Sequence, residues 1–221
     1  MSNQTSPYKQ MLQAAQAHMQ SGQFAAAAAA AAQALAIMKP MMSANNPQLA
    51  QAYGLHGEAL LGQALVSTSV EEMTEVYRQA VEAQQGQVAV LEEGMLGAEL
   101  LEARGNLGAA LVESWRYEEA VPVVETARNE ALELLADESS QVGRAEYLAL
   151  SCLLGEALAG CQRYSQAKSM LVSCFHQLQP HDYHQLEVVQ NLQAITGMLA
   201  ELIQQEADSA SEAASPASSQ A

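Results

Sequence analysis

The sequence predicts an all-α fold built as a helical solenoid. Small residues recur at four landmark positions, Ala15, Gly62, Gly108 and Gly155, which are 47, 46 and 47 residues apart. A fixed period of this size is typical of proteins that stack copies of one supersecondary unit. Apolar residues form 49% of the chain, with alanine the most prominent, whereas only 5% of residues are aromatic. No segment alternates apolar and polar residues as a half-buried strand does, so closely packed helices are favoured over a sheet.

Three further sets of positions recur with the same period. The first set follows the turn within each repeat and comprises Phe24, Val70, Tyr117 and Tyr164. The second lies three residues later, at Ala27, Met73, Ala120 and Ala167. The third lies seven residues beyond the second, at Ala34, Ala80, Ala127 and Cys174. Because residues at i and i+7 share one face of a helix, these mostly small side chains predict one packed face on the second helix of each repeat.

We expect four helix pairs followed by one more helix, at 8–39, 47–84, 87–136, 139–179 and 182–206. Asn46 before Pro47 is a favourable helix start, because asparagine caps the free N–H groups and proline suits the first helical position. Gln85-Gly86 is taken as a break between the second and third pairs. The repeat domain is therefore expected at 8–206, between a flexible N-terminus at 1–7 and a disordered tail at 207–221, which contains only Ala, Ser, Asp, Glu, Pro and Gln.

The motif residues of the third and fourth repeats resemble the tetratricopeptide repeat (TPR). They are Leu107-Gly108, Leu111, Tyr117, Ala120 and Ala127, and then Leu154-Gly155, Leu158, Tyr164 and Ala167. The run 106–122 is similar to the long-helix repeats of kinesin light chains and their bacterial relatives. The resemblance covers about 8–206, and the copies at 8–40 and 47–84 are degenerate. It implies a right-handed α-solenoid of about four hairpins with a C-terminal capping helix, whose first helices line a concave groove that binds a partner protein.

Carried over position by position, the resemblance assigns twelve residues to this groove. They are Lys9, Leu12, Gln16, His56, Leu60, Gln63, Glu99, Glu102, Asn106, Glu113, Leu153 and Glu156. Such a groove changes from neutral and weakly basic to acidic, which favours a basic or amphipathic segment of another protein as the partner. Chaperone-type repeats grip a terminal carboxylate with Lys, Asn and Arg side chains, and only Asn106 matches that set. The alternative that the carboxylates only solvate an exposed helix face stays open.

The net charge is −16 and is unevenly distributed along the chain. Residues 1–57 contain Lys9, Lys39 and no acid, whereas 58–137 contain sixteen acids and four arginines. An acidic surface repels phosphate backbones and anionic lipid, so we expect neither nucleic acid nor a membrane as a partner. The three cysteines have no paired spacing, and the N-terminal residues do not resemble a signal sequence, so a cytoplasmic location with reduced thiols is expected.

No catalytic constellation is found in the sequence, which contains none of the GxSxG, GxxxxGK[ST] or strand-associated GxGxxG motifs. Cys174, His176, His181 and His184 lie within eleven residues, but without the spacing of a known metal site. We therefore expect an adaptor that is not an enzyme and needs neither metal nor cofactor. Two other functions stay open. One is an assembly subunit that self-associates through the alanine-rich, acid-free N-terminal repeat, and the other is a dedicated chaperone for one client protein.

Overall fold

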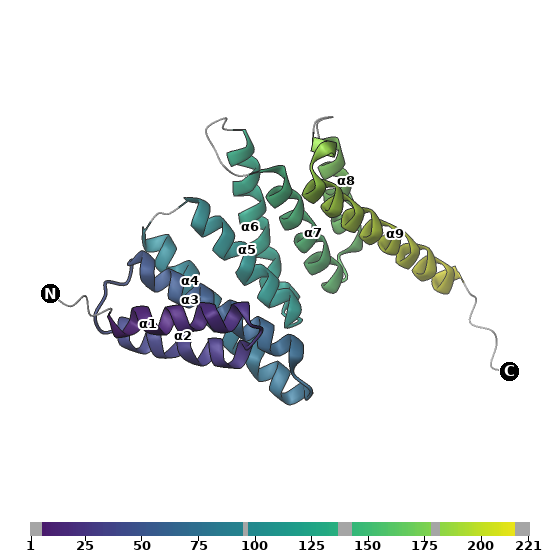
Figure 1. Ribbon diagram of the computed structural model, residues 1–221. Helices are drawn as coiled ribbons and strands as arrows, with labels where there is room; N and C mark the ends of the chain where they lie inside the picture. Colours follow the sequence, from purple (N-terminus) through teal and green to yellow (C-terminus); the bar gives the residue numbers. More distant parts are fainter. Residues whose placement is uncertain (1–5, 95–96, 137–142, 178–181, 215–221) are drawn as a thin grey trace. The chain divides into compact units, whose positions relative to one another are not determined.

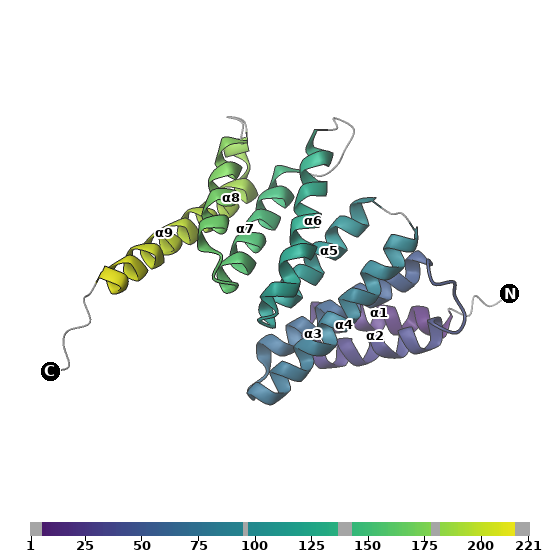
Figure 2. The ribbon, with the colours of Figure 1, turned by 180° about the vertical axis from the view of Figure 1, so that it is seen from behind.

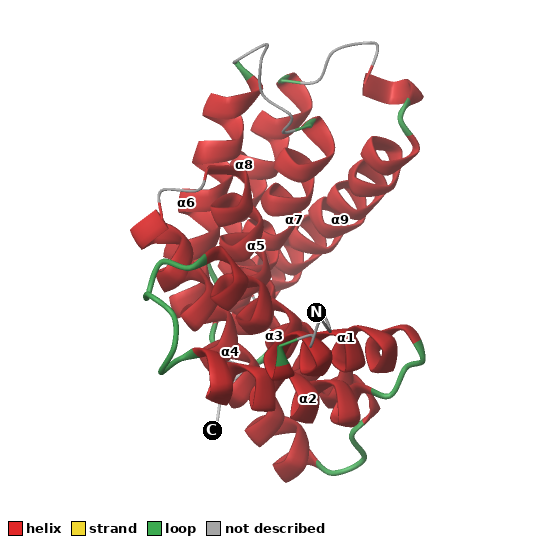
Figure 3. Cartoon of the chain, turned by 60° about the vertical axis from the view of Figure 1, so that its left-hand side comes forward, coloured by secondary structure: helices red, strands yellow, loops and turns green. Residues whose placement is uncertain are grey.

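The computed structural model describes residues 6–94, 97–136, 143–177 and 182–214 (Figure 1). Within these ranges the regular elements are helices and none is a strand, which confirms the predicted all-α fold (Figure 3). The elements are α1 (Pro7–Gln20), α2 (Phe24–Met38), α3 (Pro47–Val66), α4 (Val70–Gly94), α5 (Gly97–Glu113), α6 (Tyr117–Leu135), α7 (Arg144–Gly160), α8 (Tyr164–His176), η1 (Asp182–His184) and α9 (Leu186–Ala214). Among the described helices, none is long and apolar enough to cross a membrane.

The chain forms two compact units, Met1–Arg116 and Tyr117–Ala221, which we call unit 1 and unit 2 and describe separately. In unit 1 each helix packs on the next one along the chain, from α1 to α5. In unit 2, α7 packs on α6, α8 and α9. Helix α9 therefore covers α7, which agrees with the C-terminal capping helix that the sequence predicts. The third predicted hairpin is divided, because α5 ends unit 1 and α6 begins unit 2.

Two predicted helix boundaries near the second repeat have different outcomes. The start of α3 is confirmed, because Oδ1 of Asn46 accepts the N–H of Gln48 at 2.9 Å and Pro47 is the first helical residue. The predicted break at Gln85-Gly86 is wrong, since α4 continues through it to Gly94. A Cβ on Gly86 would lie 2.4 Å from the ring of Tyr53. This glycine therefore permits close helix packing and does not end the helix.

The last helix also differs from its expected bounds. A short 3-10 turn, Asp182–His184, precedes α9, which continues to Ala214 and so passes the predicted end near 206. The rest of the predicted tail, 215–221, lies outside the described residues, as do residues 1–5 of the predicted N-terminal segment.

The landmark positions are buried, but their contacts differ from one repeat to another. Ala15 has no exposed surface, and a Cβ on Gly62 would lie 2.4 Å from Phe24 at the start of α2. A Cβ on Gly155 would instead meet Met198 of α9 at 2.7 Å and Leu171 of α8 at 3.2 Å. Gly62 therefore fits against the preceding repeat, whereas Gly155 fits against α8 of its own repeat and against α9. In both places a larger side chain would separate packed helices.

Candidate protein-binding surface

The twelve predicted groove residues fall into two sets, because Leu153 and Glu156 lie in unit 2 and the other ten in unit 1. In unit 1, only some of the predicted residues of α1 are exposed at the surface. Lys9 and Gln16 are exposed, whereas Leu12 is half-buried against the cluster that includes Leu35 and Met38. Leu12 therefore belongs largely to the core of the first hairpin.

The three residues predicted on α3 are buried or half-buried. Leu60 is buried in the cluster that contains Ala27 and Tyr77, and Gln63 is half-buried. His56 lines an open hollow of about 480 Å³ together with Lys39, Tyr53 and residues of α2 and α4. Burial lowers the pKa of His56, and the nearby charge of Lys39 lowers it further. The predicted residues are thus on the side of α3 that contacts the second helices.

The exposed side of α3 carries Gln51, Leu55 and Glu58, at i, i+4 and i+7. Gln51 and Glu58 are exposed, and the half-buried Leu55 packs beside the alanines of α1 and α2. This face was not among the predicted groove residues. Alanine, leucine and glycine occur around most of α3, so the apolar pattern does not select one side of the helix.

Helix α5 exposes the three acidic residues that were predicted for the groove. Glu99 and Glu102 are exposed and Asn106 is half-buried, all on one face of the helix. Glu113 is exposed, but its carboxylate accepts a hydrogen bond of 3.4 Å from the buried Tyr77 of α4. This contact directs the last turn of α5 toward α4.

Glu58 of α3 and Glu102 of α5 come within electrostatic reach of each other. Glu58 is exposed at the surface, but neighbouring groups partly desolvate its carboxylate. This desolvation raises the pKa of Glu58 above its ordinary value, and the negative charge of Glu102 raises it further. Within the described ranges, no lysine or arginine pairs with either carboxylate. The nearby Arg104 is engaged elsewhere, with its Nη2 2.9 Å from Oε1 of Glu92. We call Glu58, Glu99 and Glu102 the acidic face of unit 1.

In unit 2, Leu153 and Glu156 lie one helical turn apart on α7, with Leu153 half-buried and Glu156 exposed. The neighbouring Cys152 turns toward α9, where its Sγ is 3.7 Å from the carbonyl oxygen of Asn191. Burial is the main cause that raises the pKa of Cys152, to about 11, so this thiol is protonated at neutral pH. Cys152 is therefore part of the α7–α9 packing.

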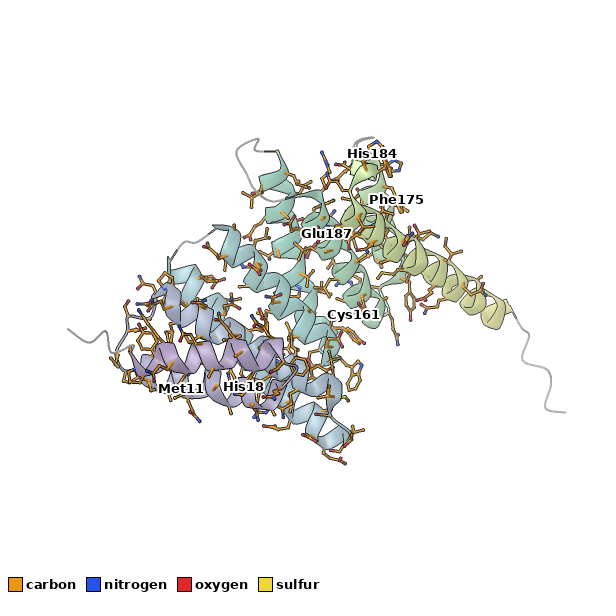
Figure 4. The ribbon with its side chains drawn as sticks, in the orientation of Figure 1. Met11, His18, Cys161, Phe175, His184 and Glu187 are labelled. Atoms are coloured by element: carbon orange, nitrogen blue, oxygen red, sulfur yellow. The ribbon has the colours of Figure 1, made fainter. Side chains whose placement is uncertain are left out.

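No three His, Cys, Asp or Glu side chains of the described residues are grouped as a metal site. Of the four residues noted in the sequence, His181 lies outside the described ranges, and Cys174 is buried beside Tyr147 and Met170. Figure 4 shows Cys161 at the α7–α8 turn and His184 at the opposite end of unit 2.

A scan against protein-family models finds no match, and a search of curated proteins finds no significant match either. Similar solved structures include the crystal structure of a candidate kinesin light chain from Podosopora anserina with nearly identical TPR-like repeats. It is 17% identical, with a TM-score of 0.62 over 92% of this chain and 98% of that chain. A single-substitution variant of that protein gives 17% identity and a TM-score of 0.63, over 94% and 99% of the two chains. At this identity the likeness concerns the fold, and this chain has the fold of TPR-like helical repeats.

Proposed function

We propose that this protein is a non-catalytic adaptor that binds a basic or amphipathic segment of another protein along the acidic face of unit 1. The TPR-like fold supports this role, because stacked helical hairpins leave extended surfaces that no other element of the repeat covers. A bound segment lies across α3 and α5, with Gln51 and Leu55 beside the carboxylates of Glu58 and Glu102.

The observation that carries the proposal is the placement of two acids, Glu58 on the exposed side of α3 and Glu102 on that of α5, which have no basic partner among the described residues. They are close enough for Glu102 to add to the effect of desolvation on the pKa of Glu58. A partly desolvated carboxylate next to another carboxylate is unfavourable unless a cation approaches both. A lysine or arginine of a partner supplies that cation and forms charge-assisted hydrogen bonds. The acidic face therefore selects positive charge, while the half-buried Leu55 offers an apolar contact next to it.

The test is calorimetric binding of a lysine-rich amphipathic peptide at low and high salt. Each exposed ion pair contributes about 0.5 kcal/mol, so the double variant Glu58→Gln/Glu102→Gln should weaken binding about fivefold and reduce its salt dependence. Glu118→Gln/Glu125→Gln is the matched control, because it removes two exposed acids from α6 of unit 2. Equal affinity in the two double variants would contradict the proposal.

Self-association is a second candidate function, favoured by the outer side of α2. Ala25, Ala29, Gln33 and Ala36 are exposed there at helical spacing and carry no charge. Two helices whose exposed side chains are this small and uncharged can pack closely against each other. We expect Ala29→Glu to dissociate any oligomer seen by sedimentation, and a wild-type chain that is monomeric at high concentration would exclude this function.

A further inference from the structure

Four large apolar side chains are exposed at the turns of unit 1, where α3 meets α4 and where α5 ends. Leu65, Val66, Val70 and Trp115 expose 74%, 64%, 66% and 60% of their surface. We call these four residues the turn patch. We propose that the turn patch docks a hydrophobic segment of a partner protein that is flanked by basic residues. This surface is separate from the acidic face, and the inference does not depend on the proposed function.

The chain and one hydrogen bond bring the four residues to the same end of the helices. Leu65 and Val66 end α3, and Val70 begins α4 after three intervening residues. Val70 and Tyr77 lie on one face of α4, seven residues apart. The hydroxyl of Tyr77 donates a hydrogen bond to Glu113, the last residue of α5, and Trp115 follows two residues later. Figures 1 and 2 agree that the α3–α4 turn and the end of α5 lie on the same side of unit 1.

The turn that holds Trp115 does not require an aromatic residue. Trp115 has a left-handed backbone, with φ of 57°, and the corresponding positions in the α1–α2 and α7–α8 turns are Gly22 and Gln162, with φ of 70° and 60°. Glycine adopts this conformation without strain, whereas a bulky side chain does not. A tryptophan that is both strained and exposed has a poor structural rationale, and tryptophan is among the commonest energetic anchors of protein interfaces.

Acidic residues outnumber basic ones next to the turn patch in the sequence, because Arg116 is the one base within two residues of its members and three acids lie equally near. Glu71 and Glu72 are exposed directly after Val70, and Glu113 lies two residues before Trp115. The acids are not needed to cap α4, because Oγ of Ser69 already accepts the N–H of Glu72 at 3.0 Å. Two copies of the patch would bring like charges together, so self-association is disfavoured. Basic residues beside an apolar core complement this rim.

Trp115 is the only tryptophan in the chain, so its fluorescence reports this site alone. The probe is an 18-residue peptide of leucine and lysine with no aromatic residue. On binding, the Trp115 emission should shift to shorter wavelength and become less accessible to acrylamide. Leu65→Ser/Val66→Ser should weaken binding at least fivefold with an unchanged helical circular dichroism spectrum. Glu58→Gln/Glu102→Gln should leave the Trp115 shift intact, which separates this site from the acidic face.

Trp115→Gly is a second variant, and misfolding cannot explain a loss of binding in it. Glycine suits the left-handed backbone, so its melting temperature should equal or exceed that of the wild type, while calorimetric affinity for the peptide falls. An unshifted Trp115 emission, or equal affinity of the Leu65→Ser/Val66→Ser variant, would overturn the proposal. Equal binding of a leucine–glutamate peptide would overturn the choice of a basic partner. Wild-type dimers that dissociate when Leu65 and Val66 are replaced would show that the occupant is a second copy.

Discussion

Gly54 in unit 1 and Tyr147 in unit 2 occupy equivalent places in their repeats, each eight residues before a landmark glycine. Around Gly54 the helices come close, and a Cβ there would lie 2.8 Å from Nε2 of Gln87. Tyr147 instead fills the space between helices and is 1% exposed. The same position of the repeat thus supports two kinds of helix interface. Gly54 lets the helices approach closely because it has no side chain, whereas Tyr147 fills a wider space with a large one.

The polar groups of the two interfaces are satisfied to different degrees. In unit 2, Nη2 of Arg128 donates to the hydroxyl of Tyr147 at 2.6 Å, and Nε of Arg128 donates to Ser151 at 3.1 Å. In unit 1, Gln84 is completely buried, and within the described ranges neither atom of its amide has a hydrogen-bond partner. A buried polar group without a partner costs about 1–3 kcal/mol. The comparison indicates that the α3–α4 interface of unit 1 is less well optimised than the α6–α7 interface of unit 2.

The largest expected effect is at Tyr147. Tyr147→Ala should lower the free energy of unfolding by about 3–5 kcal/mol, because it leaves a cavity and removes the acceptor of the Arg128 guanidinium. Tyr147→Phe retains the ring, which lies 4.9 Å from that guanidinium, and should cost about 1–3 kcal/mol. Urea unfolding followed by circular dichroism measures both. If the two variants lost the same free energy of unfolding, the hydrogen bond, and not the packing of the ring, would dominate this interface.

The next effect has the opposite sign. Gln84→Met keeps a similar volume and removes the unpartnered amide, so it should raise the free energy of unfolding by about 1 kcal/mol or more. Gln85→Met is the matched control, since Gln85 is exposed on the same helix and its replacement should change little. A destabilised Gln84→Met variant would remove the contrast between the two interfaces.

The smallest effect concerns Glu58 and depends on pH. Its pKa is raised in the folded chain, so the folded state binds more protons than the unfolded state between the ordinary value of 4.5 and the raised one. Stability is therefore lost as pH rises through that window, and the full cost is present at pH 7. Glu58→Gln should raise the melting temperature at pH 7, and this gain should disappear at pH 4. A gain independent of pH would show that charge is not its cause.

The period of the sequence was enough to predict the helices, because Ala27, Ala120 and Ala167 must be small wherever helices pack closely, and all three are fully buried. The same reasoning failed at Gly86, since a glycine that ends a helix and one that lets Tyr53 pack against it look alike in sequence. It also failed to place Glu58, because the apolar residues around α3 do not define an outer side.

The most direct test of the account is nuclear magnetic resonance mapping of the lysine-rich peptide on the intact chain. The adaptor proposal predicts amide shift changes in α3 around Gln51 to Glu58 and in α5 around Glu99 and Glu102, which disappear in the Glu58→Gln/Glu102→Gln variant. The claim that this acidic face binds a partner would be contradicted if the peptide shifted no amide signal in these segments of α3 and α5. It would also be contradicted if the shift changes were the same in the Glu58→Gln/Glu102→Gln variant.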